Sequence, residues 1–357
     1  MIRLLWILPL VELLSGVGGP AYEHRTTNDP LSVHIAVVDP RVLAIEAGTA
    51  RGLAIGRETV TAIAGREGAV LAVNGGFFRI GGTFDGDPAG ILKIGDEWLS
   101  EPSLVRGALG WRERGREAVI GRVGMEWAVT VGGRRYDVDG VNRQRGAGEL
   151  LLFTSVFGPT TLTSSGGSEL VVDGSGRVVE IVTEGNAAIP PYGMVVSFGT
   201  NRRTDGHHDK LGSSVHVEYE FVIPESGGPS DADWRRMDFI VGGTPVIVRG
   251  GEPVRDFTPE RVRADFVEGR HPRTAVGIRP DGKWVFVVAD GRRPDFSIGM
   301  TLAELAELML SLGCAEALNL DGGGSSTFYL YGRVMNLPSD LTGERPVSDA
   351  ILVKQLE

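Results

Sequence analysis

The chain of 357 residues has room for one large domain or about two smaller ones. Its net charge of −10 argues against a nucleic acid or an anionic membrane surface as the main partner. The hydrophobic content of 42% is enough for a substantial core, while 52 glycines and the scarcity of helix-like segments predict strands and turns. We therefore expect an α+β protein with strand-rich mixed sheets and few helices.

The N-terminal segment Met1–Gly19 has the composition of a secretory signal peptide: one basic residue, a short apolar stretch interrupted by Glu12, and small residues at its end. It is too short for a stable membrane span. A single cysteine, Cys314, excludes an intrachain disulfide. We expect an exported protein that is periplasmic, attached to the cell envelope or extracellular. The oligomeric state cannot be inferred from the sequence.

The first third of the chain predicts two strands, a helix and a further strand. The polar segment Tyr22–Asp29 is typical of a linker, and Leu31–Asp39 and Val42–Glu46 alternate as strands. Glu58–Arg66 has the pattern of a short helix. Ala69–Val73 is a run of small and β-branched residues, which predicts a buried strand.

The middle of the chain, from about residue 108 to residue 226, consists of short strand-like runs separated by turn residues. This pattern predicts an antiparallel layer, with 123–225 as a possible β-rich subdomain inserted into a main domain of residues 20–357. His207 and His208 are expected to lie in a solvated turn, because adjacent side chains of a strand point to opposite faces.

One clear helix is predicted at 302–312, packing on the sheet. Thr301 and Glu304 form a capping box at its start, four leucines and a methionine make one apolar stripe, and Gly313 ends it. A short apolar run follows the helix and ends at Asp321.

Three glycines and two serines follow this carboxylate: Gly322, Gly323, Gly324, Ser325 and Ser326. Glycine N–H groups can face an anion without a Cβ in the way, and serine hydroxyls can add hydrogen bonds. The alternative is an ordinary hairpin turn between two strands. A tight turn requires neither the third glycine nor both serines, so the longer string favours a binding loop.

Other strand ends also combine glycine or proline with polar residues. They are Asn74-Gly75-Gly76, Gly242-Gly243-Thr244-Pro245, Arg270–Thr274 and Asp290-Gly291-Arg292. Arginine can bind a phosphate through two parallel hydrogen bonds. Two aspartates can divide the roles of acid and of base or nucleophile, as they do in sugar hydrolysis. Together these segments predict one pocket at the ends of several strands.

At these residues the sequence resembles the phosphodiester glycosidase family. The matching strings are Ala72–Phe78, Gly242–Val248, Arg270–Gly277, Ala289–Arg292, Ser297–Ala306, Leu318–Thr327 and Glu344–Ser348. They follow the order of the family and extend from about Leu31 to the C-terminus. Three positions depart from its pattern, with Thr244 in place of a third glycine, Asp349 where asparagine is common and Arg293 where glutamine is frequent.

The resemblance implies hydrolysis of the glycosidic bond of a sugar-1-phosphodiester, of the N-acetylglucosamine-1-phosphate type, in cell-envelope or exopolysaccharide metabolism. Loss of a phosphate leaving group requires charge stabilisation more than protonation. We therefore expect Arg273, Ser325, Ser326 and the amides of Gly322, Gly323 and Gly324 to bind the phosphodiester.

Asp321 or Asp290 is expected to stabilise the sugar cation or to activate water, and the sequence does not order the two. Asn74 is a candidate hydrogen-bond partner of the sugar, and Gly75 and Gly243 are expected at the pocket. Arg345 is a second candidate for binding, or else the structural partner of a buried carboxylate.

Two other functions remain open. The same pocket could belong to a non-catalytic module that binds a glycan or an envelope polymer. The second alternative function is that of a metal-dependent phosphodiesterase, which breaks the P–O bond. Asp290, Asp321 and either Asp85 or Asp87 could bind Mg²⁺ or Ca²⁺ through oxygen. The preferred interpretation includes no metal and no other cofactor.

Overall fold

The computed structural model of the chain describes residues 18–27, 29–102, 104–202, 210–224 and 228–356. Nearly all of the predicted signal peptide and the two adjacent histidines lie outside these ranges. The described residues form four sheets and a few short helices, which confirms the strand-rich α+β prediction. All strand pairings between named strands are antiparallel except the pairing of β10 with β11.

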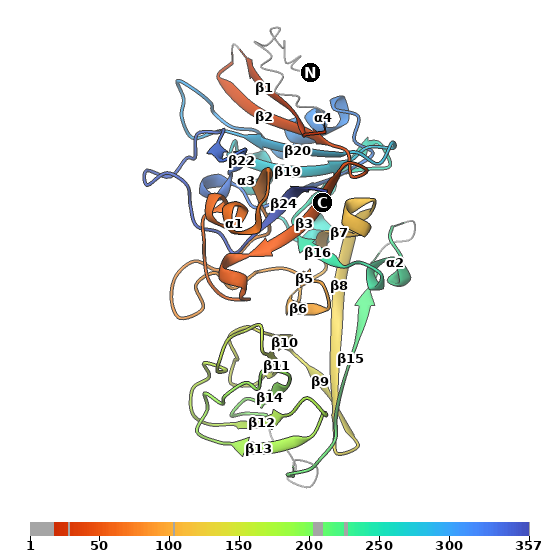
Figure 1. Cartoon of the computed structure of the whole chain (residues 1–357), viewed down its shortest axis with the longest axis vertical. Coiled ribbons are helices and arrows are strands. Elements are labelled where there is room, and N and C mark those ends of the chain that lie inside the picture. The colour runs from red at the N-terminus through yellow and green to blue at the C-terminus, as the bar shows by residue number, and fades with distance from the viewer. Residues whose placement is uncertain (1–17, 28, 103, 203–209, 225–227, 357) are drawn as a thin grey trace.

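The first sheet has seven strands and crosses the upper part of the molecule (Figure 1). In spatial order they are β1 Ala21–Thr27, β2 Leu31–Val38, β20 Trp284–Ala289, β19 Arg273–Ile278, β21 Glu316–Asn319, β17 Val246–Arg249 and β18 Glu252–Pro253. The linker prediction for Tyr22–Asp29 is wrong, because most of this segment is the edge strand β1, paired with β2 along its whole length. Polar side chains are compatible with an edge strand, since one of its sides faces solvent.

The predicted helix is α4, Leu302–Ser311, and it packs on this first sheet. The Thr301 hydroxyl accepts from the amide of Glu304, whose carboxylate accepts in return from the Thr301 amide, so the capping box is confirmed. Its apolar stripe is buried against the sheet. Gly313 ends the helix with a positive φ of 83°.

The second sheet has five strands in the order β23-β22-β4-β24-β3. Their bounds are β23 Arg333–Val334, β22 Phe328–Leu330, β4 Leu71–Asn74, β24 Asp349–Gln355 and β3 Leu43–Thr49. Helix α1, Val60–Glu67, covers one face through Val60, Ile63 and Ala64. The sheet joins segments from both ends of the chain.

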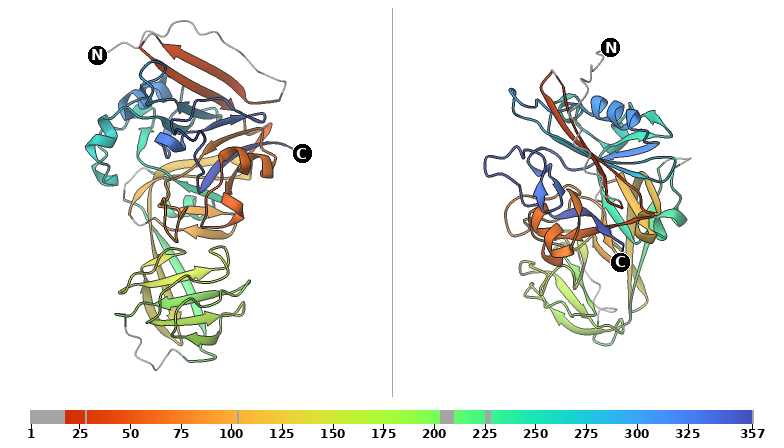
Figure 2. Two further views of the ribbon diagram at one scale, coloured as in Figure 1. Left: turned by 90° about the vertical axis from the view of Figure 1, so that its left-hand side faces the viewer. Right: turned by 45° about the horizontal axis from the view of Figure 1, so that its top comes forward.

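The third sheet connects the upper body to a lower lobe. Its main path is β15 Val215–Val222, β8 Glu117–Val131, β7 Arg106–Arg112, β16 Phe239–Gly242, β5 Leu92–Ile94 and β6 Glu97–Ser100, with β9 Arg134–Val138 paired to β8. The long strand β8 and its partner β15 run down to the lobe in Figures 1 and 2.

The lobe contains the fourth sheet, whose order is β10-β11-β14-β12-β13. The strands are β10 Gly140–Val141, β11 Leu150–Thr154, β14 Met194–Phe198, β12 Ser168–Val172 and β13 Val178–Val182. Its two faces contribute to separate apolar clusters, one with Trp127 and Phe198 and another with Phe153 and Phe157. An independently folding insertion at 123–225 stays a prediction.

The largest core cluster lies among the three upper sheets and contains Trp111, Trp284, Phe286 and Phe328. Both indole N–H groups are satisfied: Trp111 donates to the carbonyl of Ile45 and Trp284 to that of Gly115. The two remaining helices are short, α2 Asp231–Arg235 and α3 Ala264–Glu268. Within the described ranges, the helices lack the length and apolar character needed to cross a bilayer.

Candidate active site

The glycine loop after β21 connects two different sheets. Strand β21 pairs within the first sheet and β22, which follows the loop, pairs within the second. The hairpin alternative is therefore wrong, because the flanking strands do not pair with each other. The amide of Asp321 donates to the carbonyl of Gly75 and the amide of Gly323 to that of Pro272. The loop is thus anchored to segments from both sheets.

Two arginines lie close above this loop. A Cβ added to Gly323, whose φ is 64°, would lie 2.8 Å from a terminal nitrogen of Arg292. A Cβ on Gly324 would lie 2.2 Å from both Nη2 of Arg345 and Oδ1 of Asp340. At Gly323 the positive φ favours glycine, and at Gly324 a side chain would displace the ion pair of Arg345 with Asp340.

The Asp321 carboxyl lies at the start of the loop and has a perturbed pKa. Burial above all, and to a smaller extent the carboxyl of Asp349, raise its pKa to about 6. The Ser325 hydroxyl, the Gly322 amide and the Arg345 guanidinium oppose this shift. The Gly322 amide donates to Oδ1 at 2.8 Å. Asp321 can therefore gain or lose a proton near neutral pH.

A second carboxyl, Asp349, reaches the same place from the first residue of β24. Its Oδ1 accepts from the amide of Gly76 at 2.9 Å, and its Oδ2 accepts from the Ser348 hydroxyl. Burial raises the pKa of this carboxyl as well. Sequence reasoning did not select Asp349 as a site residue. The one sequence feature that pointed to Asp349 was an aspartate at a position where the resembled family commonly has asparagine.

The two arginines of the loop differ in their partners. Arg345 forms a bidentate ion pair with Asp340, at 2.7 and 2.9 Å. The Arg292 side chain is exposed and has no hydrogen-bond or ion-pair partner among the described residues. Its backbone has a φ of 61°. The sequence placed Arg292 in the predicted pocket through the segment Asp290-Gly291-Arg292 without giving it a role of its own, and it is the guanidinium next to the loop that is free to bind an anion.

Three consecutive residues at the end of the loop have buried hydroxyl groups that form no hydrogen bond of normal geometry: Ser325, Ser326 and Thr327. Buried hydroxyls normally have partners, so such a run is unusual. The Ser325 hydroxyl still lies close enough to Asp321 to lower the pKa of its carboxyl. These groups are candidates to pair with a bound ligand after a small local movement.

Asn74 connects the strands that carry the site. Its Nδ2 donates to the carbonyl of Asp321 at 2.8 Å. Its Oδ1 accepts from the Thr274 hydroxyl at 2.7 Å and from the amide of Thr327 at 3.2 Å. The side chain is fully buried, so its hydrogen bonds fix the loop to β4 and β19. A sugar contact of Asn74 stays a prediction.

The backbone of Arg273 lies beside the loop, but its side chain turns into the protein. Nε donates to the carbonyl of Met300, and Nη2 donates to the carbonyls of Phe266 and Gly269. The guanidinium also covers the Phe266 ring at 4.6 Å. Burial lowers its pKa to about 10. Phosphate binding by Arg273 stays a prediction, and the observed contacts are those of a side chain that supports α3 and the start of α4.

The Asp290 carboxylate is buried and surrounded by donors. Oδ2 accepts from the Ser32 hydroxyl at 2.8 Å and lies 3.3 Å from Nε2 of His34. Oδ1 accepts from the Leu337 amide and from the side chain of Asn336, which also donates to the carbonyl of Ser326. A catalytic role of Asp290 stays a prediction, and its contacts are those of a carboxylate that positions the loop.

The carboxylates considered for a metal are Asp290, Asp321, Asp85 and Asp87. Within the part of the chain that the structure describes, no group of three or more His, Cys, Asp or Glu side chains could hold a metal ion. Asp85 forms an ion pair with Arg57 at 2.8 Å. Asp87 is buried near Glu101, and burial together with this neighbour raises its pKa to about 7.

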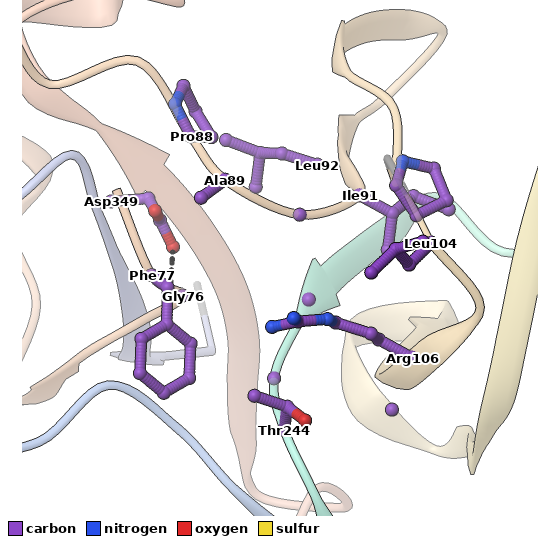
Figure 3. Close-up of a pocket in the computed structure, with 15 residues that line it drawn as sticks. Gly76, Phe77, Pro88, Ala89, Ile91, Leu92, Leu104, Arg106, Thr244 and Asp349 are labelled. Atoms are coloured by element: carbon purple, nitrogen blue, oxygen red, sulfur yellow. Dashed lines mark hydrogen bonds between the residues drawn. The ribbon is translucent and has the colours of Figure 1, made fainter. Parts of the chain in front are cut away.

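A narrow pocket lies on the other side of Gly76 (Figure 3). Asp349, Gly76 and Gly243 line it, so it shares a carboxyl with the glycine-loop site. A Cβ on Gly75 would lie 1.8 Å from Oδ1 of Asp349, and one on Gly243 would lie 2.6 Å from the carbonyl oxygen of Asn319. Both glycines are therefore required for close packing around the site. Direct contact of Gly75 or Gly243 with substrate stays a prediction.

Solved structures with the same fold come from two bacteria. A hypothetical protein from Synechocystis superposes with a TM-score of 0.81 at 24% identity, over 97% of this chain and 64% of that one. A protein from Burkholderia pseudomallei superposes with a TM-score of 0.75 at 25% identity, over 92% of this chain and 75% of that one. The architecture is therefore shared by these proteins.

Sequence comparisons relate the chain to proteins of two kinds. An uncharacterized protein of Rickettsia conorii is 27% identical over 233 residues, which are 63% of this chain and 76% of the relative. Human N-acetylglucosamine-1-phosphodiester alpha-N-acetylglucosaminidase is 43% identical over 75 residues, 21% of this chain and only 14% of the human protein. The model of the phosphodiester glycosidase family matches residues 166–354, just over half of the sequence. The chain belongs to the phosphodiester glycosidase family.

Proposed function

We propose that the protein hydrolyses the glycosidic bond of a sugar-1-phosphodiester and releases the sugar. The observation that carries this proposal is the pairing of two carboxyls, Asp321 and Asp349, beneath a loop that is covered by the guanidinium groups of Arg292 and Arg345. Acid chemistry and anion stabilisation are thus available within one site. The human relative of the family bears a name that describes this reaction class.

In the proposed reaction the bond between C1 of the sugar and the phosphate oxygen breaks. Its electron pair leaves with the phosphate, while water adds a hydroxyl to C1 and loses a proton. The leaving phosphate monoester gains negative charge, which Arg292 would stabilise together with Arg345. Removal of a single stabilising donor of this kind costs about 2.7–4 kcal/mol in a studied protease.

Asp321 is proposed to act on the sugar side. With a pKa of about 6, its carboxyl is mostly ionised at pH 7 and can accept the proton of water or stabilise a positive sugar ring. Asp349 would then tune the proton affinity of Asp321 from beneath the Gly75–Gly76 backbone. Asp290, Arg273 and Asn74 are proposed as positioning residues, because their polar groups are engaged within the protein.

The physiological setting is proposed to be the cell envelope or exported polysaccharide. Two observations support export: the composition of Met1–Gly19, and the similarity to the Burkholderia protein, whose name provisionally describes it as exported. The substrate would then be an envelope glycan with sugar-1-phosphate linkages.

The test is hydrolysis of an N-acetylglucosamine-1-phosphodiester of a small alcohol in water labelled with ¹⁸O. We expect release of the sugar with the label on its anomeric hydroxyl, because the C–O bond breaks. The Asp321→Asn variant should release little sugar. Label in the phosphate would indicate P–O cleavage, and tight binding without turnover would indicate a glycan-binding module. Either result would overturn the proposal.

A further inference from the structure

The narrow pocket beside Asp349 contains a charged group that the proposed reaction does not use. Figure 3 shows the Arg106 side chain extending from the start of β7 into the space between Thr244 and the Gly76–Phe77 segment. The opposite and upper walls are mostly apolar, with Pro88, Ala89, Ile91, Leu92 and Leu104 among the lining residues.

Arg106 has no partner for its charge in the described chain. Its Nε is buried without a hydrogen bond, and no carboxylate forms an ion pair with its guanidinium among the described residues. A guanidinium that is partly removed from water without a counterion is costly.

The nearby carboxylate of Glu260 is not available to neutralise it. Glu260 is fully buried, and its oxygens accept from Arg122, from the Thr244 hydroxyl and from the amides of Gly107 and Val246. Apart from the Asp349 carboxyl, which lines the pocket without forming an ion pair with Arg106, the walls are mostly apolar, so the positive charge has no ion-pair partner among the described residues.

The size of the pocket limits what can enter. The free space is about 20 Å³, which is room for a group of about the size of one water molecule. A single oxygen of a carboxylate or phosphate at the end of a larger ligand fits this space, and a sugar ring does not. Glycines at positions 76, 107, 242 and 243 allow the surrounding backbone to approach closely.

The pocket and the proposed reaction site share the carboxyl of Asp349. The two carboxyls that flank Gly75 and Gly76 interact with each other, and Asp349 also lines the pocket. A ligand group beside Arg106 would therefore belong to the molecule whose sugar-1-phosphate lies at Asp321.

We infer that Arg106 binds a second anionic group of the substrate, a carboxylate or a phosphate, separate from the phosphodiester that is cleaved. This inference rests on the proposed function and narrows its substrate class to acidic glycans. A uronic acid residue and a second phosphate of the same polymer would both bring a negative charge into the pocket. The experiment below distinguishes these two sources of the anion.

The kinetic test uses three sugar-1-phosphodiesters that differ only in the aglycone: neutral, with a carboxylate, or with a second phosphate. We expect kcat/KM to be at least tenfold higher for one charged substrate than for the neutral one, and the better of the two identifies the anion. Arg106→Gln should remove this preference. Arg114→Gln, which removes an exposed arginine at the far end of the same hairpin, should retain it. Equal preference in wild-type and Arg106→Gln protein would overturn the inference and leave the proposed function intact.

A binding test does not depend on turnover. Calorimetric titration with glucuronate and with inorganic phosphate should give an anion-binding event that Arg106→Gln removes and Arg114→Gln retains, separate from any phosphate binding at Arg292. Leu104→Glu should also remove it, because the new carboxylate would occupy the pocket and pair with Arg106. Unchanged titrations in both pocket variants would overturn the inference. If no sugar phosphodiester is hydrolysed but Arg106-dependent binding is found, the proposed function fails and the anion site stands.

Discussion

Asp321 and Asp349 are both hydrogen-bonded to the Gly75–Gly76 segment, and the carboxyl of Asp349 lies near enough to raise the pKa of Asp321. Asp321 follows β21 of the first sheet, and Asp349 begins β24 of the second. The amide of Asp321 donates to the carbonyl of Gly75, while the amides of Gly75 and Gly76 donate to the carbonyl and the carboxylate of Asp349. Three hydrogen bonds donated by backbone amides thus fix the two acids where the two sheets meet.

The first prediction concerns Asp321→Asn, which should lose activity and gain stability. We expect kcat to fall by about 10²–10⁴-fold, the usual contribution of a positioned acid or base.

The folded-state pKa of Asp321 is raised from 3.8 to about 6, so the native protein binds more protons than the unfolded chain between these values. Stability therefore falls as pH rises through this window. One pKa unit corresponds to about 1.4 kcal/mol, so the variant should be more stable by up to about 3 kcal/mol at pH 7.5.

Urea unfolding of both proteins at pH 3.5 and pH 7.5 measures this difference. Asparagine keeps an oxygen that can accept from the Gly322 amide, so the local hydrogen bond survives. The gain should be small at pH 3.5, where the aspartate is neutral in the native state and mostly neutral in the unfolded chain. A variant that is less stable than wild type at pH 7.5 would contradict the pKa argument.

The second prediction concerns Asp349→Asn, which should move the pH dependence of the reaction. A like charge nearby raises the pKa of Asp321, so its removal should lower that pKa. The acid limb of kcat/KM, expected near pH 6 in the wild type, should therefore shift to lower pH. Asparagine can still accept from the amide of Gly76, so the fold should be retained. An acid limb that stays at the wild-type pH would remove Asp349 from the proposed mechanism.

Much of the fold could be predicted because local patterns determine it. The capping box and apolar stripe of α4 are local features, and the structure confirms them. Strand β1 was missed, because an edge strand with polar side chains has the composition of a linker. Its pairing with β2 is a tertiary effect that composition does not reveal.

The candidate site was harder to predict at the level of side chains. The sequence strings locate the segments that meet, but they do not tell which way each side chain turns. Arg273 and Asp290 carry the expected chemistry, yet their polar groups are engaged inside the protein. Arg292 and Asp349 received less weight, and the direction of their side chains became visible only with the tertiary structure.

The third prediction concerns Arg292, the exposed guanidinium next to Gly323. Arg292→Gln should lower kcat/KM for a sugar-1-phosphodiester by about 10²–10³-fold, because one stabilising donor of the leaving phosphate is removed. Arg292→Lys should recover only part of the loss, since lysine lacks the planar fork of arginine. Arg333→Gln is the matched control, because this exposed arginine lies on β23 outside the loop. Equal losses in the Arg292 and Arg333 variants would indicate a general charge effect and contradict the assignment.

The fourth prediction compares two glycine substitutions. A Cβ at Gly75 would lie 1.8 Å from Oδ1 of Asp349, so Gly75→Ala must displace a carboxyl of the site. We expect a loss of about 3 kcal/mol or more in unfolding free energy, or a folded protein with strongly reduced hydrolysis. Gly65→Ala is the control: Gly65 lies within α1 and its Cβ would meet nothing within 4 Å. That change should stabilise the protein by about 0.5–1 kcal/mol, because alanine favours the helix. Thermal or urea unfolding and a hydrolysis assay of the two variants measure both effects. A Gly75→Ala protein with wild-type stability and wild-type hydrolysis rate would contradict the prediction, because it would show that neither folding nor hydrolysis depends on the observed position of the Asp349 carboxyl.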